Sequence, residues 1–105
     1  MTEFLFNSSG DWIAFRRSPT DKFVFNDDGD WVGWLPWGDT DVADTDGNYL
    51  GTIVGNRLVA LNRPFRGYPG YPGYPGYPGY PGYPGYAGYK PLPAGASDVR
   101  SLKKT

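Results

Sequence analysis

The chain has 105 residues and a net charge of -1, with 18% aromatic residues and neither cysteine nor histidine. This length allows one small domain, and the lack of cysteine excludes a disulfide framework and a thiolate metal site. The N-terminus has no basic start or apolar signal segment, and no stretch approaches the ~20 apolar residues of a membrane span. We therefore expect a cytoplasmic protein with no membrane span, and a near-neutral charge gives no reason to expect a nucleic-acid partner.

Composition divides the chain into three parts. All four Trp and all six Phe lie within residues 1–66, which we expect to form the only packed domain. Residues 67–90 contain only Gly, Tyr, Pro, Ala and Lys and are expected to be a low-complexity Gly-Tyr-Pro repeat tail. Residues 91–105 form a basic C-terminal extension.

The charges are also unevenly distributed along the chain. Residues 1–56 hold ten acidic and three basic residues, a net charge of -7, whereas residues 57–105 hold seven basic residues and Asp98, a net charge of +6. Either these charges belong to solvated turn residues and a soluble basic tail, or the basic tail is attracted to the acidic domain of the same or another copy of the chain.

A pattern centred on a turn recurs in the domain. It reads FLFNSSGDWIAF at 4–15, FVFNDDGDWVGW at 23–34 and DVADTDGNYLGT at 41–52, with a degraded fourth copy, VALNRPFRG, at 59–67. Asn or Asp followed three residues later by Gly is typical of a type I turn closed by a Gly in the left-handed region, which forms a bulge, so each copy is predicted to be a β-hairpin. Gly10, Gly29 and Gly47 are therefore predicted structural turn residues.

The turn also predicts which residues face one another. Phe6 is expected opposite Trp12, Leu5 opposite Ile13, Phe25 opposite Trp31 and Val24 opposite Val32. Phe4, Phe6, Trp12 and Ala14 would then share one face, and Leu5, Ile13 and Phe15 the other. The same small position recurs at Ala14, Gly33 and Gly51, which suggests that the ring of one copy packs over the small residue of the next.

With a two-residue hairpin signal at Gly55-Asn56, the simplest topology is an all-β antiparallel meander with no helix in the domain. The repeated pattern resembles the small bacterial four-fold β-flower domain, in which hairpins radiate about a pseudo-four-fold axis. The resemblance covers roughly residues 3–63. It implies a flower-like or barrel-like fold and no established activity, and the fourth copy lacks the turn spacing.

The acidic turns are the first candidate for chemistry. DTDGN at 44–48 partly imitates the start of an EF-hand, but Gly55 stands where the closing Glu belongs. Turn formation is the preferred interpretation, and weak calcium binding by clustered carboxylates is the alternative; these are Asp39, Asp41, Asp44 and Asp46. Without His or Cys we predict no enzyme activity, no catalytic residue, no metal site and no cofactor.

Aromatic residues are the better candidates for binding. Trp34 and Trp37 flank a proline in GWLPWG, where they form either a platform for a sugar, choline-like cation or apolar chain, or a cap on the barrel end. The tail adds evenly spaced rings that suit self-association or an aromatic-lined partner groove. These are Tyr68, Tyr71, Tyr74, Tyr77, Tyr80, Tyr83, Tyr86 and Tyr89.

Glycine at every third position of the tail satisfies the steric rule of the collagen triple helix, but we favour an extended, mostly disordered polyproline II linker. Ser97 is a candidate cap for a short helical turn through Leu102.

The sequence predicts a non-enzymatic binding or scaffold module whose tail self-associates or recruits an unknown protein partner. The alternative is a domain that binds a small molecule, glycan or lipid through exposed aromatic residues.

Overall fold

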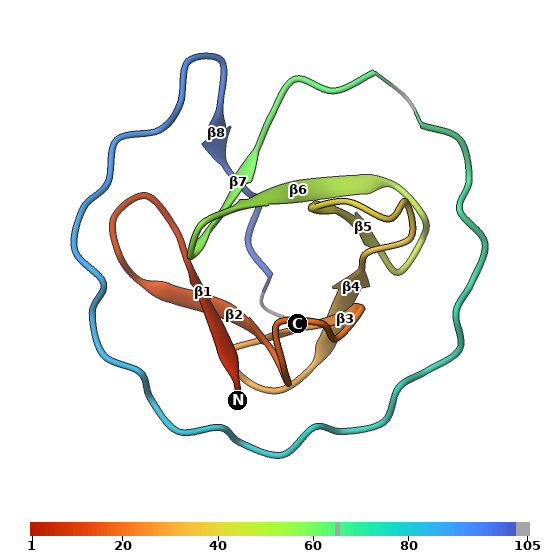
Figure 1. Ribbon diagram of the computed structural model, residues 1–105, viewed down its shortest axis with the longest axis horizontal. Helices are drawn as coiled ribbons and strands as arrows, with labels where there is room; N and C mark the ends of the chain where they lie inside the picture. The colour runs from red at the N-terminus through yellow and green to blue at the C-terminus, as the bar shows by residue number, and fades with distance from the viewer. Residues whose placement is uncertain (65, 103–105) are drawn as a thin grey trace.

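The computed structural model describes residues 1–64 and 66–102 and shows an all-β fold without helices among them. Successive strands pair antiparallel in one sheet, and a parallel bridge between Phe6 and Arg57 closes it into a barrel (Figure 1). The strands are β1 (Glu3–Phe6), β2 (Trp12–Arg16), β3 (Phe23–Asn26), β4 (Trp31–Trp34), β5 (Asp41–Asp44), β6 (Tyr49–Val54), β7 (Arg57–Ala60) and β8 (Ser97–Asp98). The predicted antiparallel meander of hairpins is confirmed.

The three hairpin turns share one hydrogen-bond pattern. In the second, Gly29 N donates to Asn26 O at 3.0 Å and Asn26 N donates to Asp30 O at 2.8 Å. The Asn26 side-chain oxygen also accepts from Asp28 N and Asp30 N, each at 2.9 Å. Gly10, Gly29 and Gly47 have φ of 93°, 86° and 90°, the left-handed region that the turn requires.

Beyond the bulge expected at its turn glycine, each hairpin contains a second β-bulge that the sequence analysis did not predict. Leu5 lies opposite Ala14 instead of Ile13, and Val24 lies opposite Gly33 instead of Val32, so the expected register is wrong beyond the first pair. Ile13, Val32 and Leu50 are the extra residues. A bulge increases local twist, which a small closed sheet needs.

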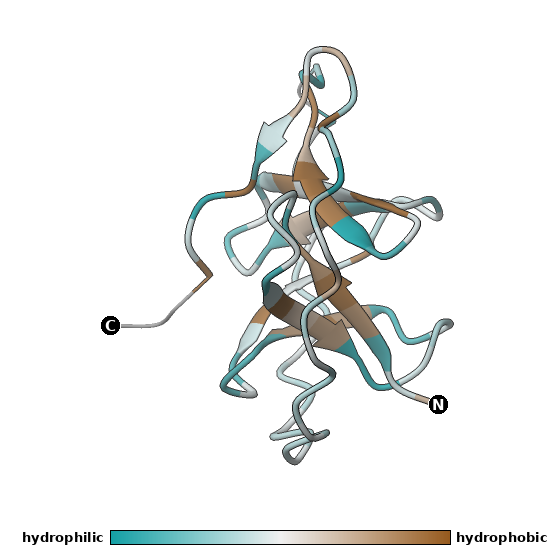
Figure 2. Ribbon diagram, turned by 90° about the vertical axis from the view of Figure 1, so that its left-hand side faces the viewer, coloured by the Kyte–Doolittle hydropathy of each residue, from teal (hydrophilic) through white to brown (hydrophobic). Residues whose placement is uncertain are grey.

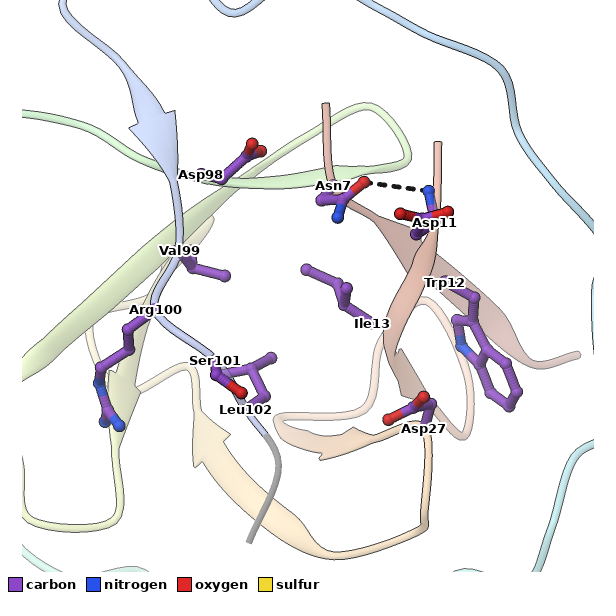
Figure 3. A pocket seen from close by; sticks show the side chains of 10 residues that line it. All are labelled: Asn7, Asp11, Trp12, Ile13, Asp27, Asp98, Val99, Arg100, Ser101 and Leu102. Carbon is purple, nitrogen blue, oxygen red and sulfur yellow. Dashed lines mark hydrogen bonds between the residues drawn. The ribbon is translucent and has the colours of Figure 1, made fainter. Parts of the chain in front are cut away.

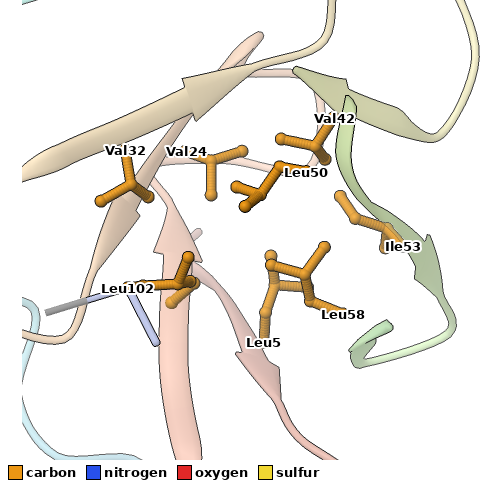
Figure 4. Packing of buried hydrophobic residues seen from close by; sticks show 9 residues of the cluster. Leu5, Val24, Val32, Val42, Leu50, Ile53, Leu58 and Leu102 are labelled. Carbon is orange, nitrogen blue, oxygen red and sulfur yellow. The ribbon is translucent and has the colours of Figure 1, made fainter. Parts of the chain in front are cut away.

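The bulges also change which residues share a face. Ala14 packs inside the barrel with Leu5, whereas Phe15 packs outside with Phe6 and Trp12, so the predicted face sets are wrong for Ala14 and Phe15. The interior is aliphatic and the outer face is aromatic. Figure 4 shows the interior cluster, which contains Leu5, Ala14, Val24, Val32, Val42, Leu50, Ile53, Leu58 and Leu102.

The expected packing of a ring over the next copy's small residue is also wrong. The indole nitrogens of Trp12 and Trp31 each donate a 2.8 Å hydrogen bond to the carbonyl of the small residue two positions later, in the same hairpin. The small side chain is required for another reason. A Cβ at Gly33 would overlap the carbonyl oxygen of Ala43 on β5, because β4 and β5 approach closely there.

The fourth hairpin is formed by segments far apart in the sequence. β7 pairs antiparallel with β8, through Val59 opposite Asp98 and Ala60 opposite Ser97. The predicted helical turn from Ser97 is therefore wrong, and Leu102 fills the barrel interior instead. The fourth repeat copy contributes β7 and no turn of its own; its Phe65, and residues 103–105 of the basic extension, lie outside the described residues.

Residues 67–90, which we call the belt, therefore form the connection between the strands of the fourth hairpin. The belt encircles the barrel (Figure 1), and in the side view it crosses the brown apolar strands as a pale trace (Figure 2). Its eight glycines have φ between 80° and 92°. Polyproline II and the collagen triple helix need negative φ at every residue, so the described glycines fit neither regular helix, and the expected extended, mostly disordered linker stays a prediction. Proline followed by glycine at φ near 80° is the pattern of a type II turn.

Candidate binding surface on the belt

The belt contacts the hairpins in reverse chain order and at a fixed interval. Tyr71 and Tyr74 lie against Trp31, with ring centroids 5.6 and 6.0 Å apart. Nine residues further on, Tyr80 and Tyr83 lie against Trp12, each at 6.0 Å. Three Gly-Tyr-Pro triplets therefore span one hairpin.

The turn glycines repeat this interval. Tyr68 lies over Gly47 and Tyr77 over Gly29, each with a ring atom 2.6 Å from where a Cβ would stand. At Gly10 the backbone of Gly88 comes equally close, at 2.6 Å. A glycine at each turn therefore serves two purposes, since it accepts a positive φ and leaves room for the belt.

The start of the belt is held by an ion-pair cluster. Arg66 Nη1 lies 2.7 Å from carboxylate oxygens of both Asp39 and Asp41, and its guanidinium covers the Trp37 ring at 4.8 Å. The hydrogen bond from Arg66 lowers the pKa of Asp39 below its ordinary value. Arg100 pairs with Asp44 at 2.9 Å. The basic part of the chain is therefore attracted to the acidic part, as the second interpretation of the charge distribution proposed.

The end of the belt is held by backbone hydrogen bonds. Ala87 N donates to Gly10 O and Lys90 N donates to Ser8 O, both at 2.9 Å. These are the only two triplets in which proline is replaced. Proline has no N–H and could make neither bond, which gives the interruption of the repeat a physical reason.

A buried arginine supports the same end. Arg57 on β7 is only 7% exposed, and its guanidinium donates to the carbonyls of Asn7, Ala87 and Gly88 at 3.0, 3.2 and 2.8 Å. A buried guanidinium needs such acceptors because an unsatisfied charged donor is costly. Arg57 therefore favours the docked belt.

The replacement Ala87→Pro makes the repeat more regular, yet we expect it to lower the free energy of unfolding by about 1 kcal/mol, because the hydrogen bond to Gly10 O is lost. Pro84→Ala is the matched control. It removes a proline from the preceding triplet and breaks no hydrogen bond from a proline nitrogen, so its effect should be smaller. Urea unfolding measures both variants, and a neutral Ala87→Pro would contradict the anchoring.

The belt presents its tyrosines outward. Each of the eight predicted tyrosines remains between 60% and 72% exposed, including the four that contact Trp12 or Trp31. Each ring therefore uses only part of its surface to dock and leaves the rest to solvent. The outcome is a row of exposed rings at fixed intervals around the barrel.

Trp34 and Trp37 do not come together as one platform. Trp34 packs against the outer aromatic cluster, and Trp37 lies under Arg66 beside a cavity of about 250 Å³ that Trp34 does not line. Both rings are half-buried.

The acidic turn residues act as hydrogen-bond acceptors. Asp44 accepts from Asp46 N and Asn48 N at 2.9 Å, while Asp39 and Asp41 hold Arg66. Within residues 1–64 and 66–102 no group of three such ligands is placed to hold a metal ion. The same residues contain no helix long and apolar enough to cross a membrane.

Two further cavities lie beside the hairpins. One, of about 300 Å³, lies between the C-terminal segment and the first hairpin, and Ile13 and Val99 project into it (Figure 3). The other, of about 460 Å³, lies between the belt and the second hairpin, beside Trp31.

Sequence reasoning did not identify Asp30, Trp31 or Arg57 as residues that contact or line the belt. Asp30 and Trp31 were interpreted as turn and core residues, and Arg57 received no role. The available signals were the basic residue within the apolar run IVGNRLVAL and the loss of proline in the last two triplets.

We compared the chain with protein families, curated proteins and solved structures, and none of them matches. Membership of the β-flower family stays a prediction.

Proposed function

We propose that the protein is a non-enzymatic binding or scaffold module that self-associates or recruits a protein partner through the tyrosines of its belt. The observation that supports this most strongly is that all eight rings stay 60–72% exposed although the belt is anchored at both ends. Exposed tyrosine rings are a frequent feature of protein interfaces.

The arrangement favours multivalent contact. Tyrosine supplies a large rigid contact area at low conformational cost and is enriched at interfaces. A free repeat would lose conformational entropy when it binds a partner. The docked belt loses less, because the spacing of its rings is already set. Several weak contacts at fixed spacing then reinforce one another, because each later contact forms intramolecularly.

The test is the concentration dependence of molecular mass, measured by light scattering and sedimentation on three chains. The native chain should associate as its concentration rises. A chain with all eight belt tyrosines changed to Phe keeps the rings and should still associate, whereas the matched chain with all eight changed to Ser should associate far less. If the native chain stays monomeric throughout and neither replacement alters this, self-association through the belt is wrong.

A second candidate is the binding of a small molecule, glycan or lipid through aromatic residues. The cavity beside Trp31 favours it, because four aromatic side chains line it. Trp34 and Trp37, which the sequence suggested for this role, support it less, because they are separate and Arg66 covers Trp37.

A further inference from the structure

The cavity beside the second hairpin combines aromatic walls with one carboxylate. It has a volume of about 460 Å³, and its lining includes Trp31, Tyr71, Tyr74, Tyr77, Asp30 and Thr45. Barrel and belt both contribute, so the cavity exists only when the belt is docked. Its size is in the range of small-molecule sites.

The rings are arranged as a floor and walls. Tyr71 and Tyr74 meet Trp31 at interplanar angles of 62° and 61°, so both are inclined steeply to the indole. Trp31 is only 7% exposed and forms the floor, while the three tyrosines keep most of their surface free. All four rings therefore border one open hollow, where a cation can contact them.

The charge of the lining is negative. Asp30 is its only ionisable acidic or basic side chain besides the tyrosine phenols, and no Lys or Arg lines this cavity among the described residues. The Asp30 carboxylate accepts a long hydrogen bond, 3.4 Å, from Asn26 Nδ2, which makes a shorter 2.8 Å bond to Leu102 O. Asp30 therefore retains acceptor capacity, within the part of the chain that carries a net charge of -7.

A methylated ammonium group suits this lining. Aromatic faces attract cations through their quadrupoles, and such cages are the recurring way to hold quaternary ammonium ions. A primary ammonium would lose hydrogen bonds to water that four rings and one carboxylate replace poorly. A metal ion would need more oxygen ligands than the cavity provides.

The other hairpins lack the full set. At the first hairpin Trp12 meets Tyr80 and Tyr83, but the cavity that Asp11 and Trp12 line is completed by the C-terminal segment and no belt tyrosine lines it. At the third, Asn48-Tyr49 replaces the Asp-Trp pair.

We propose that the cavity formed by Asp30, Trp31, Tyr71, Tyr74 and Tyr77 binds a methylated ammonium group, such as that of choline or of a trimethylated lysine side chain. The inference rests on the docked belt of the proposed function, but it does not require the protein to self-associate.

Calorimetric titration of the full chain, at a concentration where light scattering shows only monomer, tests the site with choline and with its neutral isostere 3,3-dimethylbutan-1-ol. We expect choline to bind with a dissociation constant on the order of 1 mM and the isostere at least about tenfold more weakly. Trimethyllysine and phosphocholine serve as further probes, and whichever binds best identifies the source of the group. Absence of binding by all three cations, or equal binding of the isostere, overturns the proposal.

Variants locate the site. Tyr74→Leu should weaken choline binding about tenfold, Tyr74→Phe should retain it, and Asp30→Asn should weaken it about threefold. Tyr89→Leu is the matched control, since Tyr89 is an exposed belt tyrosine that does not line the cavity. An equal loss in Tyr89→Leu contradicts the site, as does full binding in Tyr74→Leu. Choline binding without self-association would contradict the association alone, and association without choline binding would contradict the site alone.

Discussion

The variant Gly10→Ala is expected to lose about 3 kcal/mol of unfolding free energy, roughly twice the loss of Gly29→Ala. Both glycines have nearly the same left-handed conformation, with φ of 93° and 86°. The conformational cost of adding a Cβ, about 1 to 2 kcal/mol, is therefore shared by the two variants. The difference between them comes from the belt.

At Gly10 the new Cβ would lie 2.6 Å from the backbone nitrogen and oxygen of Gly88. That backbone is held by the bond from Ala87 N to Gly10 O and by Arg57, so it cannot move without breaking them. At Gly29 the nearest atom is Cε1 of the exposed Tyr77 ring, which can turn away. Urea unfolding measures both variants, and equal losses would contradict the docking of the belt at Gly10.

Replacing Gly33 with leucine should also cost about 3 kcal/mol, compared with about 1 kcal/mol for Val32→Ile next to it. Gly33 does not have a positive φ, so its smallness is required by space alone. An added Cβ overlaps the carbonyl of Ala43 and comes within 3.0 Å of Val42 Cγ1. A backbone carbonyl in a paired strand cannot yield as a side chain can.

Val32→Ile is the matched control because it adds a methylene to the same strand, at a buried bulge residue that packs in the aliphatic interior. Thermal and denaturant unfolding give the two losses. If Gly33→Leu is as stable as the native chain, the close approach of β4 and β5 is wrong.

The hairpins and their order were predictable from the sequence because the signals are local. An Asn or Asp, two tolerant residues and a Gly specify the turn by themselves, and the period of the repeat places the strands between the turns. The two-residue loop at Gly55-Asn56 follows the same logic, and Val54 lies opposite Arg57 as it requires.

The second bulge of each hairpin was not predictable, because it depends on closure of the sheet. The extra residue Ile13 keeps the turn unchanged but moves Ala14 inside and Phe15 outside. Side chains therefore stop alternating strictly between the two faces at the bulge residue, just beyond the first strand pair after the turn. The predicted contact between the ring of one copy and the small residue of the next is wrong, because the observed contact is a hydrogen bond within one hairpin.

The belt conformation was not predictable from composition. A Gly-Tyr-Pro run has no partners of its own, so in isolation it suggests an extended linker. Its partners are Trp12, Trp31 and the turn glycines, which lie far away in the sequence. Proline is missing where Ala87 and Lys90 must donate, and this pattern gains its meaning only from Gly10 and Ser8 in the folded chain.

The central claim is that the belt is docked on the barrel with three triplets per hairpin. Nuclear Overhauser contacts between the tryptophan indoles and the tyrosine rings test it most directly. The structure predicts contacts from Trp31 to Tyr71 and Tyr74, and from Trp12 to Tyr80 and Tyr83, with ring centroids 5.6 to 6.0 Å apart. Narrow tyrosine signals at random-coil positions without these contacts would show a free tail, and would contradict both the docked belt and the site that depends on it.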